Sequence, residues 1–261
     1  MLRNEHYKDD VVYVTHLTRY VLTILGVWPT YNRRNSTGEK IVKYLSIFIS
    51  YMFLLCVLFP GVFFWMIEKR IRVKIQTIPL LLFGFMACAK YGNLVFRQKH
   101  ISRCLKHVEE DYRTVTSGEA REWMIEFANV GRRLIILCSF LMYGNGVSYR
   151  LILPYARGKI VTAQNITIRP LPCPAYFIFF DIQESPIYEL VFAAQVLSGA
   201  VTYMASAGIC GLATTFAMHA CGQLKIMENM LRSLVEEQGQ EKQQVDRKLA
   251  EIVEHQIRIR R

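Results

Sequence analysis

Four long apolar stretches dominate the pattern of hydrophobic and polar positions along this chain. They cover Ile41–Ile67, Ile75–Phe96, Leu134–Leu153 and Ile187–Cys221. A helix needs about 20 mostly apolar residues to cross a hydrocarbon core about 30 Å thick, and 18 or more in a row already indicate a span. The pattern therefore predicts an all-α fold, a polytopic membrane helical bundle with four spans.

A shorter apolar segment precedes the first span but is too polar to cross a membrane comfortably. Val11–Trp28 is interrupted by His16 and Arg19, a composition that suits a helix lying at the membrane surface. Pro29 cannot continue a helix, so we expect this helix to end there. The sequence thus predicts an interfacial helix near the start of the chain.

Polar segments between and after the spans also have helical character. Residues 97–133 are compatible with helices that extend spans two and three into the cytoplasm. After Gly239, apolar residues recur at the spacing of one helix face. The basic end of this tail is typical of a segment that precedes another span, so we expect a fifth span to be missing. The predicted regions are a cytoplasmic N-terminal segment (1–40), a four-span bundle (41–221) and a cytoplasmic helical tail (222–261).

The composition agrees with a membrane protein that has sizeable polar loops. Hydrophobic residues make up 52% of the 261 residues, charged residues make up 20%, and the mean hydropathy is +0.19. In a soluble protein the formal net charge of +11 would suggest a nucleic-acid partner. Here no basic run is interleaved with aromatic residues. We therefore interpret the basic residues as flanks of the spans and expect no nucleic-acid partner.

Lysine and arginine are distributed unevenly between the two sides that the spans define. They concentrate in the N-terminal segment, in residues 97–133 and in the tail, and are fewer in the two other loops. By the positive-inside rule, both ends are cytoplasmic. The sequon Asn165-Ile166-Thr167 then lies outside, which predicts a glycan on Asn165. The sequon Asn35-Ser36-Thr37 lies inside and is expected to stay unmodified.

The sequence contains no pattern that indicates catalysis or metal binding. Its seven cysteines include no CxxC pair and no Cys/His spacing typical of zinc. No HExxH, GxSxG or phosphate-binding loop occurs, and no span holds a pair of carboxylates. Internal repeats typical of transporters are also missing. We predict no enzymatic activity, no cofactor and no metal, and a membrane enzyme or transporter fragment is the less favoured alternative.

Several short motifs, taken in order, resemble those of the insect odorant receptors. Each is weak alone, but together they run across nearly the whole chain. They are Leu25-Gly26-Val27-Trp28-Pro29, Lys90 near the end of span two, Ser185-Pro186-Ile187-Tyr188-Glu189 with Gln195, His219 with Gly222-Gln223, and Glu254-His255 before the basic end. The resemblance implies a seven-span fold with a cytoplasmic N-terminus.

The same resemblance implies a role in olfaction. Such receptors assemble with a common co-receptor subunit as a tetrameric, ligand-gated cation channel in the plasma membrane of sensory-neuron dendrites. Their odorant pocket lies in the outer half of the bundle, in a surround of membrane lipid, and span seven lines the pore. Because this chain stops after the fourth span, channel activity is implied only for a full-length form. The alternatives are a gustatory receptor of the same superfamily and a non-functional fragment.

A volatile odorant is small and apolar, so it needs an apolar, aromatic-lined cavity with few polar groups. Given the topology above, the outer halves of spans two, three and four supply such side chains. We expect ligand contact from Leu82, Phe83, Met86, Tyr143, Gly146, Val147, Arg150, Val196, Gly199, Ala200 and Tyr203. Aromatic and Met residues at helical spacing are also typical of an ordinary core, and Arg150 is equally typical of a topology anchor.

Overall fold

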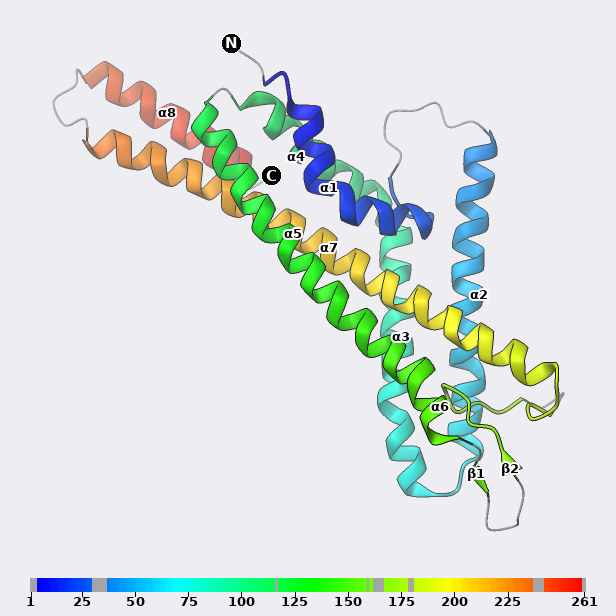
Figure 1. The fold of residues 1–261 in the computed structure, drawn as a ribbon. Coiled ribbons are helices and arrows are strands. Elements are labelled where there is room, and N and C mark those ends of the chain that lie inside the picture. Colours follow the sequence, from blue (N-terminus) through cyan, green and yellow to red (C-terminus); the bar gives the residue numbers. More distant parts are fainter. Residues whose placement is uncertain are drawn as a thin grey trace. The chain divides into compact units, whose positions relative to one another are not determined.

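Figure 1 shows the fold in a computed structural model, which describes residues 4–29, 37–115, 117–158, 160–161, 167–177, 181–236 and 242–259. The regular secondary structure of the described residues is helical apart from two short strands, which pair antiparallel with Ile160 opposite Ile168. The elements are α1 (Tyr7–Ile24), α2 (Thr37–Ile67), α3 (Ile71–Phe96), α4 (Gln98–Thr114), α5 (Gly118–Val147), the π-helix η1 (Ser148–Ile152), α6 (Leu153–Arg157), β1 (Ile160–Val161), β2 (Thr167–Ile168), α7 (Ile187–Glu236) and α8 (Lys242–Ile259). The predicted all-α class is confirmed.

Among the described residues, three helices are long and apolar enough to cross a membrane: α2, α3 and α7. They correspond to the predicted first, second and fourth spans. The predicted third span, 134–153, is helical throughout, but it is divided between the end of α5, η1 and the start of α6. It is therefore not one uniform helix of the kind that the apolar pattern predicts.

The chain folds into two compact units, each built from separate segments. Unit 1 contains residues 1–17, 103–136 and 211–261, and unit 2 contains residues 18–102 and 137–210. The predicted division into 1–40, 41–221 and 222–261 follows membrane topology instead, and it stays a prediction. Since α5 and α7 are long, each contributes one end to unit 1 and the other to unit 2.

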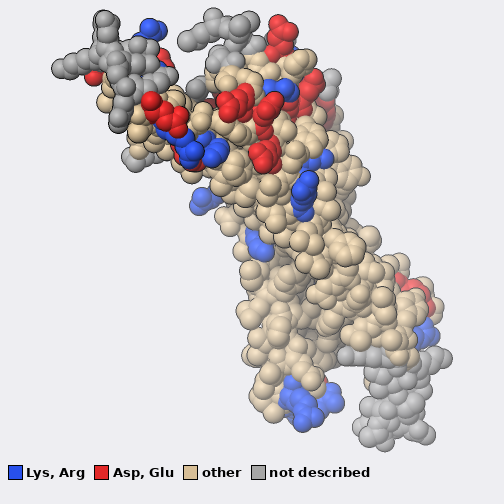
Figure 2. All heavy atoms as spheres, turned by 60° about the vertical axis from the view of Figure 1, so that its left-hand side comes forward, with Lys and Arg blue, Asp and Glu red and all other residues tan. Residues whose placement is uncertain are grey.

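Within unit 2, α2 and α3 pack along each other and leave much apolar surface outward. Only 28% and 22% of their most apolar windows are buried, as suits helices that face lipid. Figure 2 shows few charged side chains over the long helices on this face, and a basic group at the lower end. The turn between α2 and α3 lies there and carries Lys69 and Arg70.

Unit 1 is held by a small apolar core between α1, α4, α5 and α7. Because α4 places its apolar residues on one face, Val108 and Tyr112 are buried while its charged residues remain outside. The buried members of this core are Val14, Val108, Tyr112, Met124 and Ala128. This packing fixes the start of α1 against two helices that lie about a hundred residues further along the chain.

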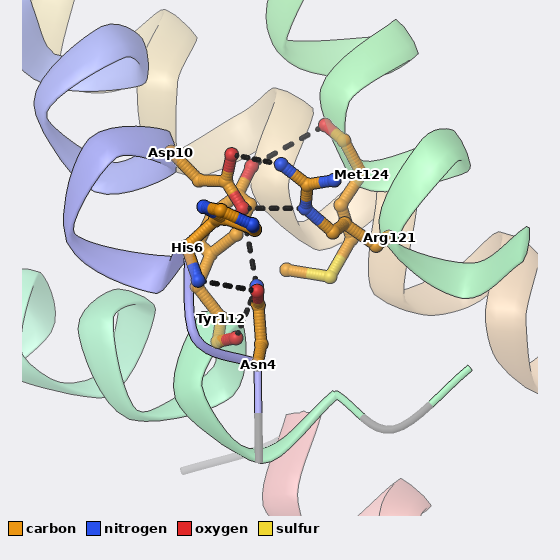
Figure 3. Close-up of polar contacts among 6 residues, drawn as sticks. All are labelled: Asn4, His6, Asp10, Tyr112, Arg121 and Met124. Carbon is orange, nitrogen blue, oxygen red and sulfur yellow. Dashed lines mark hydrogen bonds and ion pairs between the residues drawn. The ribbon is translucent and has the colours of Figure 1, made fainter. Parts of the chain in front are cut away.

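A polar network at the edge of this core fixes the orientation of α1 relative to α4 and α5 (Figure 3). Arg121 of α5 donates two hydrogen bonds of 2.7 Å to the two carboxylate oxygens of Asp10 on α1. Asn4 donates from its amide to both Asp10 and the Tyr112 carbonyl, each at 3.1 Å. The paired geometry is the bidentate arrangement that makes Arg–carboxylate bonds strong and specific.

The end of α1 differs from the prediction. The helix stops at Ile24 rather than at Pro29, because Gly26 adopts a left-handed conformation with φ 70°. The amides of Val27 and Gly26 bond back to the carbonyls of Leu22 and Thr23, the usual pattern of a glycine-terminated helix. This turn belongs to unit 2, where the buried Tyr91 hydroxyl donates to the Leu25 carbonyl at 2.8 Å.

Replacing Gly26 by alanine is expected to destabilise unit 2 by roughly 2 kcal/mol, since a left-handed conformation costs an L-residue about 1–2 kcal/mol. The new Cβ would also lie 2.8 Å from the backbone oxygen of Lys43. Thermal unfolding of the purified chain in detergent micelles measures the change. Gly144→Ala is the matched control, because a Cβ there meets nothing within 4 Å. An unchanged melting temperature for Gly26→Ala would contradict this account of the turn.

Candidate ligand-binding site

Unit 2 contains a small enclosed cavity bounded by α2, α3, η1, α7 and the loop that precedes α7. Its volume is about 20 Å³, which is room for about one water molecule. Most of its wall is apolar, with hydroxyls from two threonines and a serine and one charged side chain, that of Arg150. The lining residues are Leu54, Val57, Leu58, Gly61, Thr77, Leu80, Leu81, Phe83, Gly84, Arg150, Cys173, Pro174, Ser198 and Thr202.

Arg150 enters the cavity wall from the π-helix η1. A π-turn changes which side chains face inward and is often found at functional sites. The Arg150 side chain is buried, and its Nη1 donates to the backbone carbonyl of Gln195 on α7. Its guanidinium lies 6.0 Å from the centre of the Tyr203 ring, within cation–π range. Among the described residues, its Nε has no hydrogen-bond partner.

Two glycines allow these large side chains to lie against the helices. A Cβ at Gly199 would overlap the Arg150 side chain, and a Cβ at Gly146 would overlap the Tyr203 ring. The Tyr203 ring also contacts Phe83 and Tyr143, with ring centres 5.8 Å and 6.1 Å apart. The small residues at these two positions therefore create the space for an aromatic cluster beside the arginine.

The loop before α7 forms one wall of the cavity, and the Gln195 side chain fixes its buried part. The Gln195 amide accepts the Cys173 backbone N–H at 2.9 Å and donates to the Cys173 carbonyl at 3.0 Å. Both residues are almost fully buried. Tyr176 adds a backbone bond to the Pro60 carbonyl of α2 at 3.2 Å. Gln195 thus replaces the strand partner that this stretch of backbone would otherwise need.

The structure brings together six of the eleven residues predicted to contact a ligand. Phe83 and Arg150 line the cavity, and Tyr143, Gly146, Gly199 and Tyr203 surround the arginine and the ring that contacts it. Val196 and Ala200 are half-buried on α7 and lie outside the cavity wall. The other three side chains are exposed; they are Leu82, Met86 and Val147.

Sequence reasoning missed the contribution of the first span and of the loop before α7. Leu54, Leu58 and Gly61 of α2 and Cys173 of the loop are part of the wall. The adjacent Pro60 and Gly61 were a usable signal, because such a pair inside an apolar helix often marks a close approach. The predicted glycan site at Asn165 lies outside the described residues.

Motif residues in the tail make contacts within unit 1 instead. His219 Nε2 lies 2.9 Å from a carboxylate oxygen of Asp111, and His255 Nε2 lies 3.3 Å from the Gln223 carbonyl. In the part of the chain that the structure describes, no group of three His, Cys, Asp or Glu side chains is arranged to hold a metal ion. These residues therefore tie α7 to α4 and α8.

Comparison with known families gives these features a context. The family model described as 7tm Odorant receptor matches residues 70–261, well over half of the chain. The chain belongs to the odorant receptor family. No match was found among curated proteins.

Two solved structures share the fold. One is the insect olfactory receptor OR5 from Machilis hrabei in complex with eugenol, with a TM-score of 0.72 and 13% identity over 98% of this chain. The other is a second structure of OR5 from Machilis hrabei, with a TM-score of 0.64 and 15% identity over 96% of this chain. Identities this low establish similarity of fold alone. In both cases the match spans 64% of the length of the solved receptor.

Proposed function

We propose that this chain binds a small volatile ligand in the cavity of unit 2. In full-length form, together with a co-receptor subunit, it opens a cation channel in olfactory neurons. The observation that carries the proposal is an apolar, aromatic-flanked cavity in a member of the odorant receptor family. The similarly folded OR5 has been solved in complex with eugenol, which supports the proposal that this fold binds a small ligand. The odorant family match also favours this function over a gustatory one.

The size of the cavity sets a condition on binding. A volume of about 20 Å³ holds one water but no odorant, so a ligand has to displace side chains from the wall. Phe83 of the wall and Tyr203, which packs on it, are the suitable candidates, because both rings are half-buried and neither is held by a hydrogen bond among the described residues. Movement of these rings would enlarge the cavity toward Tyr143.

Tyr203→Ala and Tyr143→Ala are expected to shift the odorant dose–response of the full-length receptor, co-expressed with its co-receptor, by roughly 3- to 10-fold. Each removes an aromatic contact worth about 0.5–1.5 kcal/mol. Patch-clamp currents measure the response, and surface labelling shows whether expression has changed. Tyr44→Ala is the matched control, since Tyr44 is exposed near the other end of α2. Unchanged curves for both variants would remove these rings from the site.

We also propose that the protein resides in the plasma membrane with both described ends cytoplasmic and the loop around Asn165 outside. The concentration of Lys and Arg in the N-terminal segment, in residues 97–133 and in the tail supports this orientation. A glycosidase-sensitive shift in mobility should be lost in Asn165→Gln and kept in Asn35→Gln. A shift that depends on Asn35 instead would reverse the orientation.

A further inference from the structure

Arg150 is a buried cation that the described protein does not neutralise. Unit 2 contains five carboxylates, and none lies within 4.0 Å of its guanidinium among the described residues. Glu68 pairs with Arg70 and Glu189 with Arg169, both at the surface. The unpaired positive charge is therefore a property of the cavity wall itself. A charge inside a membrane-spanning region is costly and marks a functional site more often than a structural one.

The hydrogen-bond donors of Arg150 are also incompletely used. A guanidinium carries five N–H groups in a planar fork. Nη1 is bonded to the Gln195 carbonyl, and the buried Nε has no partner in the described part of the chain. The face of the Tyr203 ring, whose centre lies 6.0 Å from the guanidinium carbon, stabilises the positive charge in part but carries no negative charge of its own. Donors that remain unpaired in a low-dielectric environment cost about 1–3 kcal/mol each, more for charged groups. An incoming anionic oxygen would recover that cost.

The two threonine hydroxyls of the wall do not compete for this role. The hydroxyls of Thr77 and Thr202 donate to the carbonyls of Lys74 and Ser198 in their own helices, at 2.9 Å and 2.8 Å. Their hydrogens are therefore already committed. Apart from Ser198 and Cys173, the rest of the wall is formed by apolar residues such as Leu54, Leu58 and Phe83. The cavity thus combines one guanidinium with a mostly apolar wall.

We propose that the ligand of this site is an organic acid, whose carboxylate is held by the Arg150 guanidinium and whose short apolar chain lies against α2 and α3. The guanidinium fork matches the two oxygens of a carboxylate, which neutral odorants do not offer. This inference rests on the proposed function, because it assigns a ligand class to the same cavity. It requires the same displacement of Phe83 or Tyr203 to admit the chain.

The test compares acids with their uncharged counterparts on the purified 261-residue chain in lipid nanodiscs. Butyrate, hexanoate and octanoate labelled with ¹³C at the carboxyl carbon are titrated beside their methyl esters, and empty nanodiscs are subtracted. NMR reports both the affinity and the pKa of the bound carboxyl. We expect the acids to bind more tightly than the esters. We also expect the bound carboxyl to titrate at lower pH than the free acid, because the guanidinium favours the charged form.

Arg150→Met keeps an unbranched apolar stem and removes the guanidinium with its charge. It should weaken acid binding roughly 10- to 100-fold, the factor that corresponds to a hydrogen bond to a charged group. Ester binding should change by less than about twofold. Arg169→Met is the matched control, since Arg169 lies in the outer loop of the same unit with its guanidinium exposed. It should leave both affinities unchanged.

The outcomes separate this inference from the proposed function. If esters bind and acids bind no more tightly, the cavity is an odorant site but the acid assignment is wrong. If neither class binds, the proposed function of this cavity fails and the inference fails with it. If Arg150→Met does not fold, the wild-type chain alone tests the acid assignment, through the difference in affinity between acids and esters and through the pKa of the bound carboxyl. A bound carboxyl whose pKa is not lowered would overturn the role of Arg150.

Discussion

Replacing Gln195 by leucine is expected to raise the alkylation rate of Cys173 roughly a hundredfold. The Gln195 amide satisfies the backbone N–H and the carbonyl of Cys173 in a region closed to water. Leucine has a similar volume but no polar atoms, so both backbone groups would be buried without partners. At about 1–3 kcal/mol each, this loss lowers the cost of opening the loop by about 3 kcal/mol, which corresponds to two orders of magnitude in the open population.

The measurement uses the thiol that the loop itself protects. Burial raises the pKa of the Cys173 thiol, and the nearby Arg150 charge offsets only part of that effect. In the wild-type chain Cys173 should therefore react slowly with a maleimide, since the thiolate is the reactive species. Cys104, an exposed cysteine of α4 outside the predicted spans, provides a fast internal reference in each sample. Mass spectrometry of the digested peptides separates these rates.

Gln183→Leu is the matched control. The Gln183 amide makes the same pair of bonds, to the Arg169 N–H at 2.7 Å and to the Arg169 carbonyl at 3.4 Å. Those bonds are only partly buried, so water replaces them when the side chain is lost. The Cys173 rate should then stay within about twofold of wild type. A wild-type rate in Gln195→Leu would show that other contacts hold the loop, with the Tyr176–Pro60 backbone bond as the next candidate.

The fold was predictable where one physical signal dominates. Long apolar runs located α2, α3 and α7, because a membrane helix has to be apolar along its whole span. The pattern placed the end of the fourth span at Cys221, whereas α7 continues to Glu236. A helix can leave the apolar region without a break, so hydropathy marks a change of surroundings and not an end. Gly26 ended α1 early for a local reason, its left-handed conformation.

The grouping of residues at the candidate site was predictable in part, because helical spacing shows which residues share a face. Gly146 and Arg150, four residues apart, do lie together beside Tyr203. Spacing does not fix the rotation of a helix that is apolar all round, which is why Leu82 and Met86 of α3 are exposed. The π-turn at η1 and the Gln195–Cys173 contact depend on tertiary packing, which no local pattern encodes.

Replacing Arg121 by methionine is expected to destabilise unit 1 by about 2–3 kcal/mol at neutral pH. The change leaves the Asp10 carboxylate, whose side chain is only 8% exposed, without its bidentate partner. Removing one member of a fully buried ion pair costs about 3–5 kcal/mol. The value here is lower because the Arg121 side chain is 39% exposed and its charge is partly screened by water. Thermal and denaturant unfolding in detergent micelles measure the difference.

Arg113→Met provides the control for loss of a surface arginine. Arg113 lies on α4 in the same unit and pairs with Glu110 at 3.2 Å, but both side chains are well exposed. Exposed pairs contribute about 0–1 kcal/mol, so this variant should unfold close to wild type. If Arg113→Met and Arg121→Met were equally destabilising, the effect would come from lost helix-surface packing and not from the buried carboxylate.

The pH dependence identifies the cause more directly. Burial alone would raise the pKa of Asp10, but the hydrogen bonds from Arg121 and Asn4 outweigh it and hold the pKa below its usual value of 3.8. A lowered pKa means that the pair stabilises unit 1 above that value and that the contribution is lost as the pH falls through the folded-state pKa. In Arg121→Met the hydrogen bonds from Arg121 are lost, so burial raises the pKa of Asp10. Protonation at low pH then removes the unpaired buried charge and restores part of the stability of the variant. The stability gap between wild type and Arg121→Met should therefore narrow below about pH 4. A gap that stays constant from neutral pH to about pH 3 would mean that Asp10 does not carry the effect.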